Sequence, residues 1–377
     1  MSGLLERERE VMERYLPGLD EQLANISLED LEKPDTDAIE LFRKSGGPAL
    51  LVPKQHGGLG ATPLEAARIQ RAIGARAPSL AVATTMHHFS VATLVGMDED
   101  GNGFEWMLLE GITEGSHLVA SGFAEGTTGQ GIFKPSMTAR KEGDCYLVSG
   151  SKRPCSLSRS MDLLTASVEI IDDSPETTFA VAVIAADLPG IEIKPFWTAP
   201  VLTGAQSDAV ILTDVPVDEQ LVVESGTVDD GHLDTLQAKA LLWFEMLMTS
   251  SYLGMATALV ERMLLQEKGD PTLRTLAAAE LDAAVAGIES VAYAVAEGQR
   301  DNRTLARALS CRYAAQDAIN RTVASAIENL GGMAFIGSPD VVYLASASRA
   351  LALHPPSRTR ALKTLASGLL GDGLEIQ

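Results

Sequence analysis

The spacing of apolar residues changes twice along this chain of 377 residues, and these two changes limit the possible folds more than any other feature. Up to about residue 117 the apolar residues recur at intervals of three and four, which predicts helices. Short alternating runs then predict strands, and the helical spacing returns after about residue 232. We therefore expect an N-terminal helical domain (1–117), a middle β domain (118–232) and a C-terminal helical bundle (233–377).

The middle domain reads as a sheet whose strands are joined by turns. Its apolar runs are CYLVSG, LLTASVEII, TFAVAVIAA, GIEIKPF and DAVILTDVPV, and segments such as DDSPE and DLPG between them have turn composition. Parallel strands need long crossover connections, usually helices, and no helical pattern separates these runs. The pattern therefore favours a closed or sandwiched antiparallel sheet over a nucleotide-binding sheet of alternating strands and helices.

The C-terminal domain is rich in alanine and amphipathic. Its helical segments, each of roughly 25 residues, are joined by loops containing EKGDP and GQRDN, and a last one reads LKTLASGLLG. Long amphipathic helices with short connections form up-down bundles. The fold class expected from the whole chain is thus α+β, with helices before the sheet and about four helices in a bundle after it.

The composition excludes several classes of function. A formal net charge of −21 with scattered Lys and Arg repels nucleic acid. No uncharged apolar stretch reaches 18 residues, and the N-terminus MSGLLERERE lacks the apolar core of a signal peptide, so we expect a cytoplasmic protein with no membrane partner. The three cysteines have no CxxC spacing, so we expect neither a disulfide framework nor a metal site.

The densest cluster of Gly, Ser and Thr lies in the segment 121–158, where the strand pattern begins. Small residues in loops between strands let backbone amides approach a flat or phosphorylated ligand. This segment is our candidate cofactor cradle. An ordinary hairpin turn is the alternative interpretation, and turn composition alone favours it.

Six segments, in order along nearly the whole chain, resemble the acyl-CoA dehydrogenase family of flavoproteins. They are VPKQHGGLG, GFAEGTTGQG, YLVSGSKRPCSLS, GAQSDAVILTDVPV, ENLGGMAF and LASGLLG. Each is weak alone, but the ordered set is specific. The resemblance implies that family's fold, with a helical domain, a β domain and a four-helix bundle, and it implies FAD as the cofactor.

The resemblance also implies which residues hold the flavin. Departures from the family pattern include Ala124 for Thr, Gln130 for Ser and Pro154 for the aromatic residue that stacks on the flavin. In the bundle, the ADP part of FAD is expected at the glycine pair of ENLGGMAF, although a helix C-cap explains those glycines equally well. The expected cofactor-binding residues are Phe123, Ala124, Glu125, Gly129, Gln130, Pro154, Cys155, Ser156, Glu328, Gly331 and Gly332.

In this family a carboxylate removes the α-proton of an acyl thioester, and the C-terminal segment ALHPPSRTR contains no acid. Some members carry the base on the first bundle helix, where this chain has Glu245. Its neighbours three and four positions away are apolar or hydroxylated, so no cation on the same helix stabilises its charge. Burial would raise its pKa towards that of a general base. Pairing with an Arg from another element is the alternative.

Two histidines form a competing catalytic set, His88 on an apolar helix and His354 in the HPP segment. Flavin monooxygenases of the same fold use histidines near the flavin, and a neutral imidazole accepts a proton at physiological pH. A histidine on a buried helix is otherwise a hydrogen-bonded core residue.

The prediction from sequence is a flavin-dependent oxidoreductase that dehydrogenates an acyl thioester, on CoA or a carrier protein, with Glu245 as base. Its electron acceptor would be an electron-transfer flavoprotein or oxygen, and the family implies a homodimer or homotetramer. The alternatives are a flavin-dependent monooxygenase or oxidase, for which His88 and His354 argue, and a catalytically silent protein that binds flavin or an acyl group.

Overall fold

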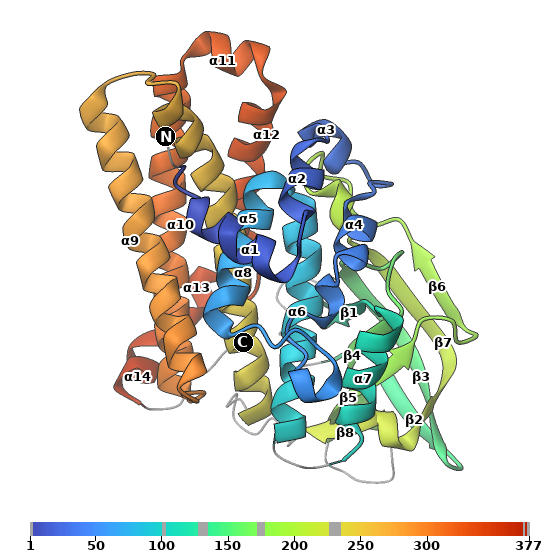
Figure 1. The fold of residues 1–377 in the computed structure, drawn as a ribbon. Coiled ribbons are helices and arrows are strands. Elements are labelled where there is room, and N and C mark those ends of the chain that lie inside the picture. Colours follow the sequence, from blue (N-terminus) through green and yellow to red (C-terminus); the bar gives the residue numbers. More distant parts are fainter. Residues whose placement is uncertain are drawn as a thin grey trace.

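The computed structural model describes residues 3–99, 103–126, 135–171, 178–225, 235–371 and 374. Helices form the part of the chain before the sheet and the part after it, as the hydrophobic periods predict, so the α+β class is confirmed. Figure 1 shows the sheet along one side of the molecule and the long C-terminal helices along the other, with α5 and α6 between them.

Seven α-helices precede the sheet in the described residues, and two of them, α6 and α7, contribute side chains to the candidate site. The 22-residue helix α6 is apolar on all sides. By length and composition alone it could cross a membrane. However, 78% of its apolar stretch is buried inside the structure, as expected for a core helix. The helices are α1 (Glu6–Tyr15), α2 (Leu19–Ala24), α3 (Leu28–Leu31), α4 (Ala38–Lys44), α5 (Pro63–Arg76), α6 (Pro78–Glu99) and α7 (Glu105–Gly115).

The middle strands form one sheet in the order β6-β7-β3-β2-β4-β5-β8, with β1 paired to β4. Most neighbours are antiparallel, but β1 and β2 each pair parallel with β4, so the prediction of an antiparallel sheet is wrong for these two pairs. A short loop in the sequence predicts only an antiparallel hairpin. The parallel partners of β4 are joined to it by longer connections, which carry no such pattern. The strands are β1 (Val119–Gly122), β2 (Thr138–Glu142), β3 (Cys145–Cys155), β4 (Leu163–Ile171), β5 (Thr178–Ala185), β6 (Ile191–Lys194), β7 (Asp208–Asp218) and β8 (Val222–Ser225).

The C-terminal part contains three long helices, α8 (Thr235–Leu265), α9 (Pro271–Ala296) and α10 (Asn302–Leu330). The expected fourth helix is instead divided into short pieces. Pro339 begins a new helix, and Pro355-Pro356 prevents the chain from continuing as one. The pieces are α11 (Gly332–Gly337), α12 (Pro339–Ala347), the 3₁₀ helix η5 (Ser348–Leu353), α13 (Arg358–Ala361) and α14 (Leu365–Leu370).

Helix α8 packs closely against α5 because two glycines remove the side chains between them. A Cβ atom on Gly74 would lie 2.1 Å from the carbonyl oxygen of Ser251, and one on Gly254 would lie 2.1 Å from that of Arg71. Both distances are far below any allowed contact. This contact fixes the position of α8 between the N-terminal helices and the rest of the bundle.

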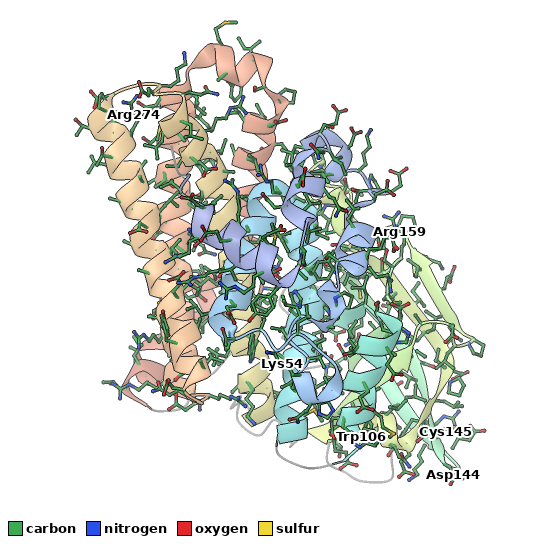
Figure 2. The ribbon with its side chains drawn as sticks, in the orientation of Figure 1. Lys54, Trp106, Asp144, Cys145, Arg159 and Arg274 are labelled. Atoms are coloured by element: carbon green, nitrogen blue, oxygen red, sulfur yellow. The ribbon has the colours of Figure 1, made fainter. Side chains whose placement is uncertain are left out.

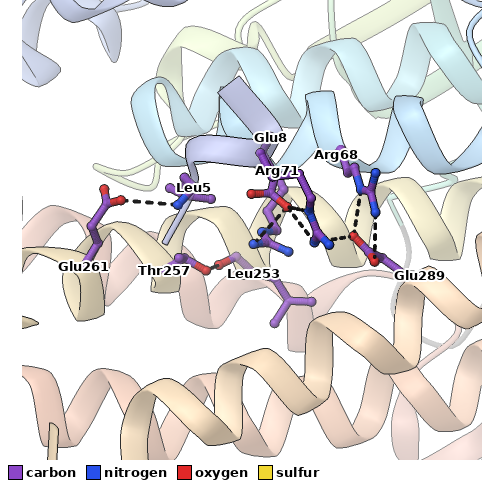
Figure 3. A network of polar contacts seen from close by, with 9 residues as sticks. Leu5, Glu8, Arg68, Arg71, Leu253, Thr257, Glu261 and Glu289 are labelled. Atoms are coloured by element: carbon purple, nitrogen blue, oxygen red, sulfur yellow. Dashed lines mark hydrogen bonds and ion pairs between the residues drawn. The ribbon is translucent and has the colours of Figure 1, made fainter. Parts of the chain in front are cut away.

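Helix α1 is tied to the same helices by a polar network (Figure 3). Buried Glu8 pairs with Arg71 of α5 at 3.2 Å, and Arg68 of α5 pairs with Glu289 of α9 at 3.0 Å. The backbone N–H of Leu5 donates to Glu261 of α8. The N-terminal helices and the C-terminal bundle therefore form one packed unit, and the sheet lies against one side of it.

Candidate functional site

A cavity of about 300 Å³ lies between the sheet and helices α6 and α8. Its walls are mainly apolar. Met86, Phe89 and Leu94 line it from α6, Leu241 and Phe244 from α8. Strands β5 and β8, the start of α7 and the segment after η5 complete the wall. A largely apolar cavity with a few polar side chains is the usual form of a small-molecule site.

Four of the expected flavin-binding residues line this cavity: Phe123, Ala124, Pro154 and Ser156. They are close together because the backbone N–H of Arg153 donates to the carbonyl oxygen of Ala124 at 2.9 Å, which brings the end of β3 beside the end of β1. The ring of Phe123 packs on Phe89 of α6, with centroids 6.3 Å apart. We call these four residues the cradle.

Hydroxyl groups lie beside the cradle. The hydroxyls of Ser156 and Ser207 are 2.9 Å apart. Ser121 also lines the cavity and is buried. These groups match the needs of a flat aromatic ring with hydrogen-bonding edges.

Glu125 and Cys155 are buried but do not line the cavity. The carboxylate of Glu125 pairs with the ammonium of Lys152, and Lys152 also donates to the hydroxyl of Ser167 at 2.8 Å. Burial lowers the pKa of Lys152, although Glu125 opposes the shift. These contacts join strands β3 and β4 behind the cradle. Burial raises the pKa of the Cys155 thiol to about 12, so this cysteine stays protonated. Gly129 and Gln130 lie outside the described residues.

His354 lines the cavity from the segment after η5, on the side of α8. Its Nε2 atom lies 2.8 Å from the hydroxyl of Tyr252, and its ring packs edge-on against Phe244. Burial and the nearby charge of Arg312 lower the pKa of His354 below its ordinary value. At neutral pH the cavity therefore contains a neutral imidazole that is oriented by a tyrosine.

Glu245 is fully buried and does not line the cavity. Both of its carboxylate oxygens accept from one guanidinium nitrogen of Arg312 on α10, at 2.8 and 2.9 Å. Burial raises the pKa of Glu245 to about 7, and Arg312 opposes the shift. Arg312 also donates to the backbone carbonyls of Leu351, His354 and Pro355. The pair thus holds the segment that carries His354.

His88 also points away from the cavity, although the same helix lines it with Phe89 and Ser90. It is fully buried against Phe42, with ring centroids 5.6 Å apart, and neither ring nitrogen has a hydrogen-bond partner among the described residues. Its neighbour His87 accepts from the backbone N–H of Val119 and lies 2.9 Å from the carbonyl of Pro48. The two histidines therefore connect α6 to α4, to the segment of Pro48 and to β1.

The residues expected at the ADP part of FAD lie elsewhere. Gly331 separates α10 from α11, Gly332 begins α11, and Glu328 is exposed near the end of α10; none of the three lines the cavity. Figure 2 shows Arg274 at the same end of the bundle, at the start of α9. The structure therefore separates the glycine pair from the cradle.

Sequence reasoning missed Tyr252, Ser207 and Arg312. Tyr252 is eight residues after Phe244 on α8, a spacing that places both on one helix face, so this signal was present in the sequence. Ser207 and Arg312 reach the site from β7 and α10, and no local pattern connects them to it.

No protein-family model matches the chain. Isobutylamine N-hydroxylase of Streptomyces viridifaciens is 43% identical over 375 residues, which cover 99% of each chain. Dibenzothiophene monooxygenase of Rhodococcus qingshengii is 30% identical over 166 residues, which cover 42% of this chain and 38% of that enzyme.

Two solved structures show the same fold. KijD3 in complex with FMN and a dTDP-linked amino sugar has a TM-score of 0.86 and 19% identity, covering 98% of this chain and 95% of the other. FMN-bound TdsC of Paenibacillus sp. A11-2 has a TM-score of 0.79 and 18% identity, covering 99% and 98%. At such identities the likeness shows the fold alone, which is the acyl-CoA dehydrogenase-like fold that the sequence motifs indicated.

The relatives support a flavin-dependent oxidoreductase and correct the finer expectations. Their names are those of an N-hydroxylase and monooxygenases, and the flavin in the two structures is FMN. They therefore support the oxygen-using alternative, and they support neither acyl thioester dehydrogenation nor FAD in particular. With 43% identity along its whole length to one such enzyme, the chain belongs to the acyl-CoA dehydrogenase-like family of flavin-dependent monooxygenases and N-oxygenases.

Proposed function

We propose that this protein hydroxylates the nitrogen of a primary aliphatic amine, using reduced flavin and molecular oxygen. The observation that carries the proposal is the neutral imidazole of His354, held by Tyr252 in the wall of an apolar cavity whose other wall is the cradle. The 43% identity to an isobutylamine N-hydroxylase supports an amine as the substrate.

The residues present fit a flavin ring. The cradle offers apolar surfaces for the ring, and the hydroxyls of Ser121, Ser156 and Ser207 can bond to its polar edge. Arg153, at the exposed edge of the cradle, lies over the ring of Phe196 and forms no ion pair with a described carboxylate. We infer that Arg153 binds the flavin phosphate. FMN is favoured over FAD because the flavin in the two similar structures is FMN.

A bound reduced flavin supplies the electrons that activate oxygen for transfer to the amine nitrogen. For that nitrogen to attack, it must be unprotonated. His354 remains neutral because burial and Arg312 lower its pKa, so its imidazole can accept a hydrogen bond from the unprotonated amine and orient the amine nitrogen. Tyr252 is a positioning residue, since its hydroxyl holds Nε2 of that ring. Apolar side chains such as Phe89 and Phe244 exclude water, which protects the activated oxygen from side reactions.

Glu245 has a positioning role in this proposal and not the role of the base. It neutralises Arg312, and Arg312 in turn fixes three carbonyls of the segment 351–355 around His354. A carboxylate enclosed by a guanidinium and absent from the cavity wall has no direct path to a substrate proton.

The test is turnover of the purified protein with FMN, a flavin reductase, NADH and isobutylamine in air. We expect an N-hydroxylated product, detected by mass spectrometry with a mass increase of one oxygen atom. His354→Gln should lower kcat by about tenfold, the equivalent of one well-oriented hydrogen bond to the amine, while flavin binding stays unchanged. Oxygen consumption that yields no hydroxylated amine with any member of a panel of primary amines would contradict the proposal.

A further inference from the structure

Glu105 provides an unpaired buried carboxylate in the wall of the cavity. It is the first residue of α7, only 4% of its surface is exposed, and it lines the cavity. Its Oε2 atom has no hydrogen-bond partner, and no described Lys or Arg lies within ion-pair distance of it. The N-terminal end of a helix favours a negative charge, but a charge enclosed in apolar surroundings is costly without a partner.

Several other polar groups of the cavity wall have hydrogen-bond partners within the protein. Ser90 donates to the carbonyl of Met86 and contacts the hydroxyl of Thr165, and Thr93 donates to the carbonyl of Phe89. Among the described lining residues there is no Lys or Arg, so Glu105 gives this lining a negative charge. The missing partner of Glu105 is therefore expected to be a positively charged ligand.

Glu105 lies at the end of the cavity away from the cradle. Phe89, which packs on Phe123 of the cradle, and Met97 are eight residues apart on α6, about 12 Å along the helix axis. Glu105 begins α7 six residues after the end of α6, and α7 packs against α6. Val181 and Val223, paired in the sheet, line the same cavity. A small monoamine with its nitrogen at the cradle would leave this carboxylate unpaired.

We propose that Glu105 binds a second cationic group, such as an ammonium, at the far end of the substrate. The substrate class is then an amine with two basic nitrogens separated by an apolar chain. One nitrogen is hydroxylated at the cradle, and the other pairs with Glu105. This inference rests on the proposed N-hydroxylation, and it adds the charge and the length of the substrate.

The experiment compares linear α,ω-diamines of four to eight carbons with the matching monoamines, using the FMN-loaded protein. Binding is measured by calorimetry with the flavin oxidised, and turnover is measured with the reductase. We expect the longer diamines to bind better than the matching monoamines. In Glu105→Gln this preference should fall by about 30-fold or more, as expected for loss of a buried charge pair, with binding of monoamines changed less than threefold. Glu114→Gln, an exposed acid on the same helix, is the matched control and should change nothing.

Glu105→Leu gives a second test, because an apolar side chain should shift the preference towards long monoamines. The flavin content of each variant reports whether it folds. Equal binding of diamines and monoamines by the native protein, or a diamine preference that survives in Glu105→Gln, would overturn the assignment of Glu105. Those outcomes leave N-hydroxylation of monoamines standing. Calorimetric binding of diamines without any hydroxylation would instead support the Glu105 site and remove the proposed reaction.

Discussion

The ion pair between Glu245 and Arg312 gives the sharpest test of how the site is held together. Glu245 is fully buried, Arg312 is 1% exposed, and their charged atoms are 2.8 Å apart. Glu245→Gln keeps the shape of the side chain but leaves the guanidinium without its counter-charge. Breaking a buried ion pair by removing one partner costs about 3–5 kcal/mol. We therefore expect the free energy of unfolding to fall by that amount.

A second variant separates the parts of this interaction. Arg312→Met also removes three hydrogen bonds to the carbonyls of Leu351, His354 and Pro355, each worth about 1 kcal/mol. Once Arg312 is absent, adding Glu245→Gln should cost little, so the double variant should be at least as stable as Arg312→Met. The coupling energy of the pair is then about 3 kcal/mol, well above that of independent sites.

The assay is unfolding in urea, followed by circular dichroism and by release of flavin, because a chain of this size need not unfold in one step. Glu280→Gln, which breaks the exposed pair with Arg321, is the matched control and should cost less than about 1 kcal/mol. If Glu245→Gln abolished turnover while its unfolding free energy and flavin affinity stayed at native values, Glu245 would be the catalytic base and the positioning role would be refuted.

Three further predictions concern the cavity and the histidines near it. Tyr252→Phe removes the hydroxyl that holds His354, so kcat should fall about tenfold, the equivalent of one hydrogen bond. Steady-state kinetics should show a nearly unchanged KM for the amine, and an unchanged kcat would count against this role. Ser156→Ala should weaken flavin binding about fivefold to tenfold by fluorescence titration, and an unchanged affinity would place the flavin elsewhere. Burial lowers the pKa of His87 to about 4, so the unfolded chain binds a proton below pH 6.5 that the folded chain excludes. The neutral state of His87 contributes on the order of 3 kcal/mol to stability, which is complete above pH 6.5 and is lost as the pH falls towards 4. Urea unfolding at several pH values measures this loss, which should be absent in a stable His87→Gln variant.

The fold could be predicted because the local spacing of apolar residues indicates helix or strand in each part of the chain. The periods of three to four in SLAVATTMHHFSVATLVGM and of two in TFAVAVIAA depend only on which faces are buried. The parallel pairing of β1 with β4 could not be predicted in this way, since the partners are more than 40 residues apart and no turn sets their register.

The site could be predicted only in part, because charged side chains pair with residues that are far away in the sequence. Phe123, Pro154 and Ser156, which the family motifs place at a flavin, line the cavity, and their contact with a flavin stays a prediction. The surroundings of Glu245 depend on Arg312, 67 residues further along the chain, so the sequence around the acid cannot tell a base from a paired structural carboxylate. Glu105 is the first residue of a helix, where acids are common, and only its place in the cavity wall distinguishes it from a surface acid.

The most direct measurement of the central claim is a single-turnover reaction of the FMN-loaded protein with a primary amine. The flavin is reduced anaerobically, the amine is added, and one equivalent of oxygen is then admitted. The account predicts close to one equivalent of N-hydroxylated amine per flavin, a yield that falls sharply in His354→Gln. Reduction of the oxidised flavin by an acyl thioester without oxygen, together with no oxygenated amine in the first reaction, would contradict it.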